Sequence, residues 1–233
     1  VSAFETALGF VTEGLESELN SLLTKKPYLS GERNSSGNTL LHVAAYHGNV
    51  ELCLLLLLYG AKIDANDGTG FTPLMVAIQF MRSDCAHMLM ERGANVNQCN
   101  EARHTALHIA CIFGCVDSVQ NLIAFKADIN AVDMYGCTPL ICATPRGHNT
   151  IIKILISAKA NVLISDYEHN NSLSLARTHG LDGDIIALIA SAYSIQNNRE
   201  RQMAEKKLRR RQELMNGNTD GKSVVTHDSS DED

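Results

Sequence analysis

The sequence predicts an all-α solenoid of helix-turn-helix units that continues into a charged helix. Similar segments recur every 33 residues, beginning at Gly37, Gly70, Arg103, Gly136 and His169. A fixed period of this length is typical of repeat architectures. Hydrophobic residues make up 45% of the 233 residues, and the prominence of Leu, Ile and Ala favours helices packed on helices. The longest apolar run, 52–59, is too short for a membrane span of about 20 residues, so we expect it to form a buried helix.

The period divides the first 195 residues into six units. Four are clear repeats, and the two at the ends are degenerate, as expected for terminal units that face water on one side. The predicted units are 3–36, 37–69, 70–102, 103–135, 136–168 and 169–195. We therefore expect one repeat domain over 1–195, in which each unit contacts mainly its neighbours.

Each clear repeat contains the signals for two helices. Threonines stand where the first helix needs its N-cap, with Ser172 as their weaker counterpart in the last unit. These threonines are Thr39, Thr72, Thr105 and Thr138. Pro73 and Pro139 follow at the first helical position, where a missing N–H is tolerated. Glycines such as Gly48 suit the left-handed residue that ends a helix, and polar segments such as 60–67 are predicted to turn outward as β-hairpin fingers.

The first helix of each clear repeat carries a version of the motif T-P-L-H-x-A, present as TLLHVA, TPLMVA, TALHIA and TPLICA. Together with the 33-residue period, this motif resembles the ankyrin repeat. The resemblance covers about 37–190 and extends more faintly to 3–36. It implies that His42 and His108 hydrogen-bond locally and tie neighbouring repeats together, rather than act in catalysis.

Several residues depart from the repeat pattern. Met81 replaces an interhelical glycine, so either a non-glycine residue is left-handed there or the helix runs on. Pro145 lies inside the first helix of the fourth clear repeat and is expected to kink it. Lys126 and Lys159 replace the second glycine of their repeats. These departures predict that the segment 136–190 opens before the N-terminal repeats.

No motif of the sequence points to an enzyme or a cofactor. The chain contains no G-x-x-x-x-G-K-[ST] loop, no G-x-G-x-x-G opening a helix and no nucleophile elbow. The seven cysteines include no CxxC pair, and their odd number favours reduced thiols over a disulfide framework. We therefore expect no catalytic residue, no cofactor and no metal site.

Charge is unevenly distributed along the chain. Residues 1–195 carry 12 Lys and Arg against 18 Asp and Glu, whereas 199–213 carries seven basic and three acidic residues. The segment 196–215 is expected to be a charged helix without the heptad pattern of a coiled coil. Its KKLRRR sequence (206–211) indicates either a solvated helix face or a nuclear-import or nucleic-acid patch. The lack of base-stacking aromatics in this segment weakens the case for RNA binding.

Two kinds of candidate modification site are present. The segments LMERGANVN and LIAFKADIN resemble the ankyrin finger recognised by the oxygen-sensing asparaginyl hydroxylase, with Asn97 and Asn130 as the targets. Alternatively, each asparagine only braces its hairpin. The last segment, 216–233, is acidic and is predicted to be disordered. Within it, Ser229 and Ser230 each precede an acidic residue by three positions, which resembles an acidophilic kinase site.

The resemblance implies a non-enzymatic module that binds another protein through exposed finger and inner-helix residues. The expected partner-binding residues are Tyr46, Phe71, Phe80, Glu101, His104, Phe113, Met134, Tyr135, Arg146 and Tyr167. Among them, Tyr135 and Tyr167 are expected at equivalent finger tips one repeat apart. The alternative for Phe80 and Phe113 is that they only pack helix on helix.

The acidic repeat domain predicts a protein partner with a basic or amphipathic segment, bound by a monomer in the cytoplasm or the nucleus. We expect neither a membrane nor a nucleic acid as the partner. Two alternatives stay open. One is a nuclear or transcriptional regulator that uses 206–211. The other is a regulatory piece of a larger enzyme, because the chain opens with Val1 rather than Met.

Overall fold

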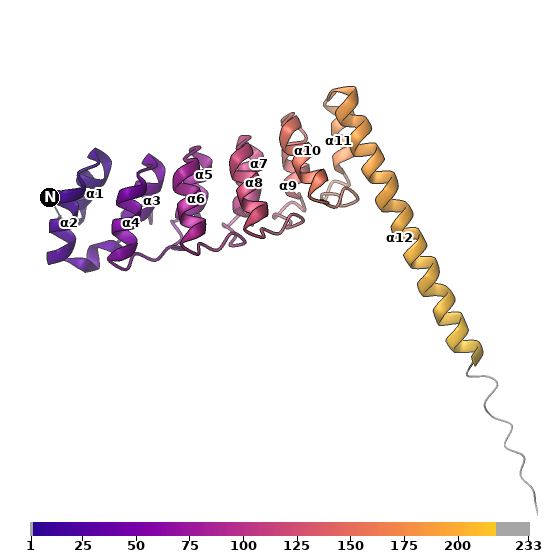
Figure 1. Ribbon diagram of the computed structural model, residues 1–233, viewed down its shortest axis with the longest axis horizontal. Helices are drawn as coiled ribbons and strands as arrows, with labels where there is room; N and C mark the ends of the chain where they lie inside the picture. The colour runs from indigo at the N-terminus through magenta and orange to yellow at the C-terminus, as the bar shows by residue number, and fades with distance from the viewer. Residues whose placement is uncertain (1, 218–233) are drawn as a thin grey trace, which may run out of the picture.

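The computed structural model describes residues 2–217, with side chains as far as Leu214, and consists of helix pairs stacked in a row (Figure 1). The loops that connect successive pairs follow one edge of the row. The helices are α1 (Ala3–Glu13), α2 (Glu16–Lys25), a 3-10 helix (Pro27–Gly31), α3 (Leu40–His47), α4 (Val50–Leu58), α5 (Pro73–Gln79), α6 (Ser83–Glu91), α7 (Ala106–Phe113), α8 (Val116–Ala124), α9 (Pro139–Ala143), α10 (Asn149–Ser157), α11 (Ser172–Thr178) and α12 (Gly183–Gly217).

Corresponding helices of successive repeats contact one another. The first helices α3, α5, α7 and α9 form one row, and the second helices α4, α6, α8 and α10 form another. Their buried side chains join in one hydrophobic core that extends from Ala7 to Ile189. The motif leucines Leu41, Leu74 and Leu107 are among its fully buried members. This arrangement confirms the predicted all-α solenoid of helix-turn-helix units.

The N-caps explain where the first helices begin. The hydroxyl of Thr72 accepts a hydrogen bond from the backbone N–H of Met75 at 3.3 Å, which satisfies one of the free donors at the start of α5. In the last unit the N-cap is Asn171, whose Oδ1 accepts from the N–H of Ser174 at 2.9 Å. The prediction of Ser172 as this cap is therefore wrong by one position, because asparagine caps a helix as well as serine does.

The departures from the repeat pattern have local consequences. Met81 is left-handed with φ 57°. Of the two alternatives predicted for this position, α5 therefore ends before Met81 and does not run on. The first helix of the fourth clear repeat, α9, ends at Ala143, before Pro145. The predicted kink is therefore wrong. Proline lacks an N–H and its ring clashes with the preceding turn, and here the helix stops instead of bending.

The finger segments, 60–71, 93–104, 126–137 and 159–170, form turns instead of regular hairpins. Between residues 2 and 217, isolated β pairing occurs as two antiparallel bridges, Cys99 with Thr105 and Ser165 with Asn171. Backbone bonds instead join each finger to the next one along the row. In these bonds the backbone N–H groups donate to backbone carbonyl oxygens at distances of 2.9–3.2 Å. The pairs, donor first, are Gly68 with Ser36, Glu101 with Thr69, Met134 with Ala102 and Tyr167 with Tyr135. Within each finger a backbone bond closes the turn, as from the N–H of Asp67 to the carbonyl oxygen of Phe71 at 2.8 Å, so the fingers resemble hairpins without the regular strands that the sequence predicts.

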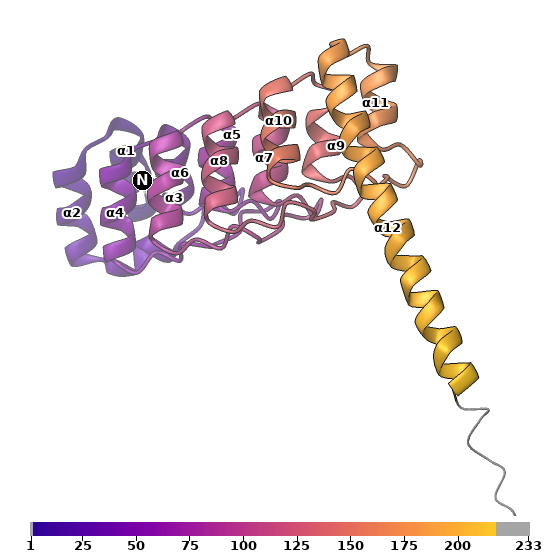
Figure 2. The same ribbon diagram turned by 45° about the vertical axis from the view of Figure 1, so that its right-hand side comes forward.

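The last helix is longer than the sequence predicts. α12 runs without a break for 35 residues from Gly183 to Gly217, so the boundary predicted at 195–196 lies inside it. Its first part packs against α10 and α11, and its second part leaves the solenoid (Figure 2). Of the predicted acidic tail, 218–233 lies outside the described residues, and so do Ser229 and Ser230.

Candidate functional site

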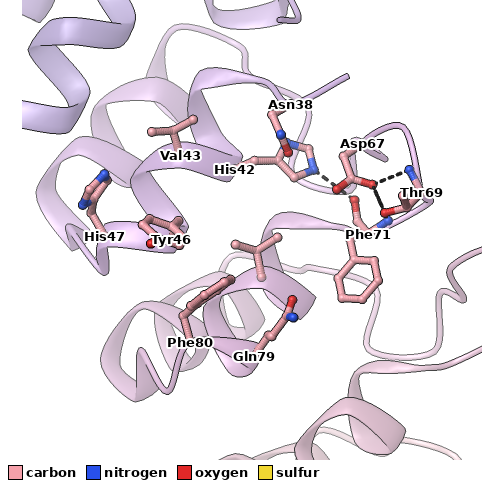
Figure 3. A pocket seen from close by; sticks show the side chains of 11 residues that line it. Asn38, His42, Val43, Tyr46, His47, Asp67, Thr69, Phe71, Gln79 and Phe80 are labelled. Atoms are coloured by element: carbon pink, nitrogen blue, oxygen red, sulfur yellow. Dashed lines mark hydrogen bonds between the residues drawn. The ribbon is translucent and has the colours of Figure 1, made fainter. Parts of the chain in front are cut away.

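A groove of about 480 Å³ opens between α3, α5 and the finger that joins their repeats (Figure 3). The side chains of Val43, Tyr46 and His47 come from α3, and Val76 and Gln79 come from α5. The remaining lining residues are Asn38, His42, Asp67, Thr69, Phe71 and Phe80. The groove therefore lies where first helices and fingers meet, which is the surface where the ankyrin-repeat resemblance predicts partner binding.

Two aromatic side chains form one wall of the groove. The rings of Tyr46 and Phe80 meet edge to face with their centroids 4.4 Å apart, and the two residues are 43% and 40% exposed. The Nε of Arg82 donates a hydrogen bond to the carbonyl oxygen of Tyr46 at 3.0 Å. Arg82 passes so close to Gly48 that a Cβ added there would lie 2.8 Å from the Cδ of Arg82. The left-handed Gly48 thus permits the contact that joins the end of α3 to Arg82, the residue before α6.

His42 lies at the base of the groove with both ring nitrogens in use. Its Nδ1 accepts from the backbone N–H of Thr39 at 3.1 Å, and its Nε2 donates to the carbonyl oxygen of Phe71 at 3.0 Å. Burial lowers the pKa of His42, so the neutral ring is favoured. His108 makes the equivalent bonds to Thr105 and Cys137. These bonds confirm the local, repeat-joining role predicted for the two histidines.

Asp67 shapes the rim of the groove and gives it a negative charge. Its Oδ1 accepts hydrogen bonds from the backbone N–H groups of Thr69 at 2.8 Å and Phe71 at 2.9 Å. These bonds fold the end of the finger into a tight turn. The same turn recurs at Asp133, whose Oδ1 accepts from the N–H groups of Tyr135 and Cys137. The finger tips are thus held in place by their own acidic side chains.

The structure brings three of the predicted partner-binding residues together. Tyr46, Phe71 and Phe80 all line the groove, and Phe71 is half-buried in it. Phe113 occupies the place of Phe80 in the following repeat and is 38% exposed, but it does not line the groove. Arg146, one repeat further, is exposed and donates from Nη1 to the carbonyl oxygen of Cys142 at 2.8 Å.

Apart from Phe71, the predicted finger residues lie along the row of fingers, outside the groove. Glu101, Met134 and Tyr167 are exposed and occupy equivalent positions in the bonds that join successive fingers. Tyr167 is therefore the counterpart of Met134. The expectation that it is the counterpart of Tyr135 is wrong by one residue. The N–H of Tyr167 instead bonds to the carbonyl oxygen of Tyr135 at 3.0 Å.

His104 is engaged in a contact between fingers. Its Nε2 lies 3.2 Å from Oδ2 of the buried Asp133, and the histidine side chain is 21% exposed. The ring of His108 lies next to it, with the ring centroids 5.7 Å apart. His104 thus contributes to the junction of two repeats as well as to the surface.

The two candidate hydroxylation sites are exposed and brace the following finger. Oδ1 of Asn97 accepts from the backbone N–H of Asp128 at 2.8 Å, and Oδ1 of Asn130 accepts from the N–H of Asn161 at 2.7 Å. Asp64 does the same for the N–H of Asn95 at 2.9 Å. Bracing is therefore present in the fold, and hydroxylation of either asparagine stays a prediction.

Sequence reasoning missed several residues of the groove, among them Val43, Val76 and Asp67. A signal for the valines was present, because residues three or four apart on a helix share a face. Val43 precedes Tyr46 by three positions, and Val76 precedes Phe80 by four. Asp67 was recognised only as part of a finger tip, since the sequence does not show that this tip faces α3.

Groups that commonly hold metal ions are dispersed in this fold. Among residues 2–217, no three His, Cys, Asp or Glu side chains are grouped to hold a metal ion. The seven cysteines are free thiols, and Cys53 and Cys85 approach to 3.4 Å between their sulfur atoms in the core. No helix in this part of the chain combines the length and the apolar character needed to cross a membrane.

Comparison with known proteins relates the repeats to one family. The family described as ankyrin repeats (3 copies) matches residues 11–100 and 92–166, which is more than half of the chain. Ankyrin repeat domain-containing protein 63 of Mus musculus is 38% identical over 115 residues, 47% of this chain. Inversin of Gallus gallus is 33% identical over 139 residues, 58% of this chain.

A third relative is the B-cell lymphoma 3 protein homolog of Mus musculus, 38% identical over 115 residues, 49% of this chain. The matched regions cover 30%, 13% and 26% of these three relatives' own lengths. The similarity is therefore one of repeats, and the relatives are longer proteins.

Proposed function

The chain belongs to the ankyrin-repeat family, and from this premise we propose that it is an adaptor that binds a partner protein through the groove between α3 and α5. Ankyrin repeats are in general protein-binding modules, and the family is typically non-enzymatic. The finer assignment, to one groove and one kind of partner, rests on the side chains that line it.

The observation that carries the proposal is the exposed pair of Tyr46 and Phe80. Large aromatic side chains are enriched where binding energy concentrates, and this chain contains only 5% aromatic residues. Two of its few aromatics lie in contact at the surface, with Phe71 beside the same groove. A partner side chain inserted there would contact three rings and the two valines without displacing a core residue.

The groove also supports a particular chemistry for the partner. Its volume of about 480 Å³ lies within the range of about 300–1,000 Å³ typical of ligand pockets, so it accommodates one or a few side chains. Val43 and Val76 add apolar side chains to its lining, and Asp67 places a carboxylate at its rim. Residues 1–195 carry an excess of six acidic residues. A segment with an apolar anchor and a neighbouring Lys or Arg fits both features.

The proposal is tested by comparing the proteins captured by three forms of the full chain from a cell extract. One form is the natural chain, one carries Tyr46→Ala and Phe80→Ala, and the third carries Tyr28→Ala. Tyr28 is 58% exposed and lies outside the groove, so it controls for the loss of a surface tyrosine. Losing a hot-spot aromatic weakens binding by about 2 kcal/mol, or roughly thirtyfold.

We expect at least one captured protein to be lost with the groove variant and retained with Tyr28→Ala. Direct titration of that protein with each form then measures the loss of affinity. If every captured protein binds the groove variant as tightly as the natural chain, the groove is not the binding surface.

A further inference from the structure

The second half of α12 is a single exposed helix. The first half is anchored by the buried residues Ile185 and Ile189. Its last anchor is Gln196, whose Nε2 donates to the carbonyl oxygen of Ala160 at 2.8 Å and whose Oε1 accepts from the N–H of Val162 at 2.9 Å. From Asn198 onward every described side chain is exposed. At 1.5 Å per residue, the part from 198 to 217 extends about 30 Å from the solenoid.

This free half is strongly basic. It carries seven cations and three acidic residues between 199 and 213. Within the part of the chain that the structure describes, none of the seven cations lies within ion-pair distance of a carboxylate. The cations are Arg199, Arg201, Lys206, Lys207, Arg209, Arg210 and Arg211. Among the described residues their charge is therefore not used in an ion pair.

The apolar side chains do not favour a membrane or a hydrophobic groove as that partner. Met203, Leu208 and Leu214 are all more than half exposed. At about 100° per residue, Leu208 projects about 140° away from Met203. A helix that lies on a membrane or in an apolar groove needs these residues on one face. Met203 and Leu214 lie on one side of the helix, but they are three turns apart, and charged residues occupy this side between them. The helix therefore lacks a continuous apolar face, and most of its available interactions are those of its charges.

The distribution of the cations indicates the shape of the partner. At about 100° per residue, all of them except Arg201 fall within an arc of about 200°. A flat acidic surface meets only one side of a helix. The major groove of B-form DNA admits an α-helix and carries phosphates on both flanks, so it can neutralise cations over such a wide arc.

We propose that the free half of α12 binds double-stranded DNA by lying in the major groove, with its lysines and arginines on the phosphates. Phosphate contacts give affinity without reading sequence. The acidic solenoid repels the same backbone, which confines DNA to the projecting helix. The narrow major groove of duplex RNA does not admit side chains in this way, and aromatic residues for stacking single strands are missing from 198–214.

Fluorescence anisotropy of a labelled 20-base-pair DNA duplex, titrated with the full chain at several salt concentrations, tests the proposal. The test variant carries Lys206→Gln, Lys207→Gln, Arg210→Gln and Arg211→Gln. Glutamine favours helix nearly as well as lysine and arginine, and circular dichroism checks that the helix is retained. The control variant removes four exposed cations of the solenoid instead, with Lys25→Gln, Lys62→Gln, Arg92→Gln and Lys153→Gln, so both variants have the same net charge.

We expect the α12 variant to bind the duplex at least tenfold more weakly. The slope of log affinity against log salt should also fall by about three to four, since each phosphate contact contributes about 0.9. The control variant should stay within threefold of the natural chain. Equal losses in the two variants, or no salt-dependent binding by the natural chain, would overturn the proposal. Tighter binding to a duplex RNA, to anionic lipid vesicles or to an acidic peptide than to the DNA duplex would overturn it as well.

Discussion

The ring of Tyr46 packs edge to face on the ring of Phe80, and the two planes are inclined by 64°. The contact joins the C-terminal ends of α3 and α5, one from each of two consecutive repeats. Aromatic pairs of this geometry contribute about 0.5–1.5 kcal/mol beyond the area that they bury. The wall of the groove therefore contributes to repeat stacking, although both rings stay available to a partner.

Tyr46→Ala and Phe80→Ala are expected to be coupled in the free energy of unfolding. A double-mutant cycle measured by urea denaturation should give a coupling of about 0.5–1.5 kcal/mol. The matched cycle of Tyr28→Ala with Phe80→Ala should be additive within about 0.5 kcal/mol, because Tyr28 lies outside the groove. Additivity in both cycles would mean that the two rings do not stabilise the fold together.

Glycine at position 126 or 159 should stabilise the chain. Lys126 and Lys159 are left-handed, with φ 66° and 67°, at the place where Gly60 and Gly93 occur in the earlier repeats with φ 81° and 87°. A side chain in this conformation costs about 1–2 kcal/mol, whereas glycine adds entropy to the unfolded chain. We expect Lys126→Gly to raise the free energy of unfolding by about 0.5–1 kcal/mol in urea titrations.

The reverse change supplies the control for this prediction. Gly93→Lys places a side chain in the same conformation, and no atom lies within 4 Å of an added Cβ there. It should therefore lower stability by a similar amount for a purely conformational reason. A stabilising effect of Gly93→Lys, or a loss of stability in Lys126→Gly, would contradict the argument.

The period, the caps and the buried leucines made most of the fold predictable from sequence. Positions such as Thr72 and Leu74 follow from local rules, because a cap or a buried leucine is needed at the same place in every repeat. The end of α9 was less predictable. Pro145 is compatible with a kinked helix or a shortened one, and only the packing of the fourth clear repeat decides between them.

The groove was only partly predictable. Tyr46 and Phe80 were found from their place in the motif, because exposed inner-helix positions recur with the repeat. The motif does not show, however, that the groove forms only between the first two clear repeats. Phe113 has the same place in the next repeat as Phe80, yet it lies outside the groove, since a groove depends on how side chains of two repeats pack.

Stability should fall as the pH is lowered through the range just below 6.5. Burial lowers the pKa values of His42 and His108 from their ordinary value of 6.5. Between the folded pKa and 6.5 the unfolded chain therefore binds more protons than the folded chain, so the free energy of unfolding falls as the pH falls. Above pH 6.5 both histidines are neutral in the folded and in the unfolded chain, so their contribution to stability is fully present.

Urea titrations at pH 7.5 and pH 5.5 measure this effect. Replacing both histidines by methionine, the residue that the second clear repeat has at position 75, should make the loss of stability between the two pH values smaller. The matched change His47→Gln removes an exposed histidine and should leave the loss nearly unchanged. An undiminished loss in the double methionine variant would show that other groups cause the pH dependence.

The repeats near the C-terminal end should open before those near the N-terminal end. α9 has only five residues, and α11 buries only Ser172 and Ala176, whereas α5 buries six residues from Pro73 to Ile78. The buried hydroxyl of Ser172 also has no hydrogen-bond partner among the described residues, which is unfavourable in a core. Because repeats couple mainly to their neighbours, this weakness stays local.

Hydrogen exchange followed by mass spectrometry should therefore show faster exchange in 139–143 and 172–178 than in 73–79. The anchoring of α12 by Gln196 works against this opening, since both polar atoms of its amide bond to the finger of the fourth clear repeat. Gln196→Ala should therefore speed exchange in 159–178 further, while Gln202→Ala on the exposed half of α12 should not. Protection in 139–143 and 172–178 equal to that in 73–79 would mean that the last helix compensates for the weak core of these repeats.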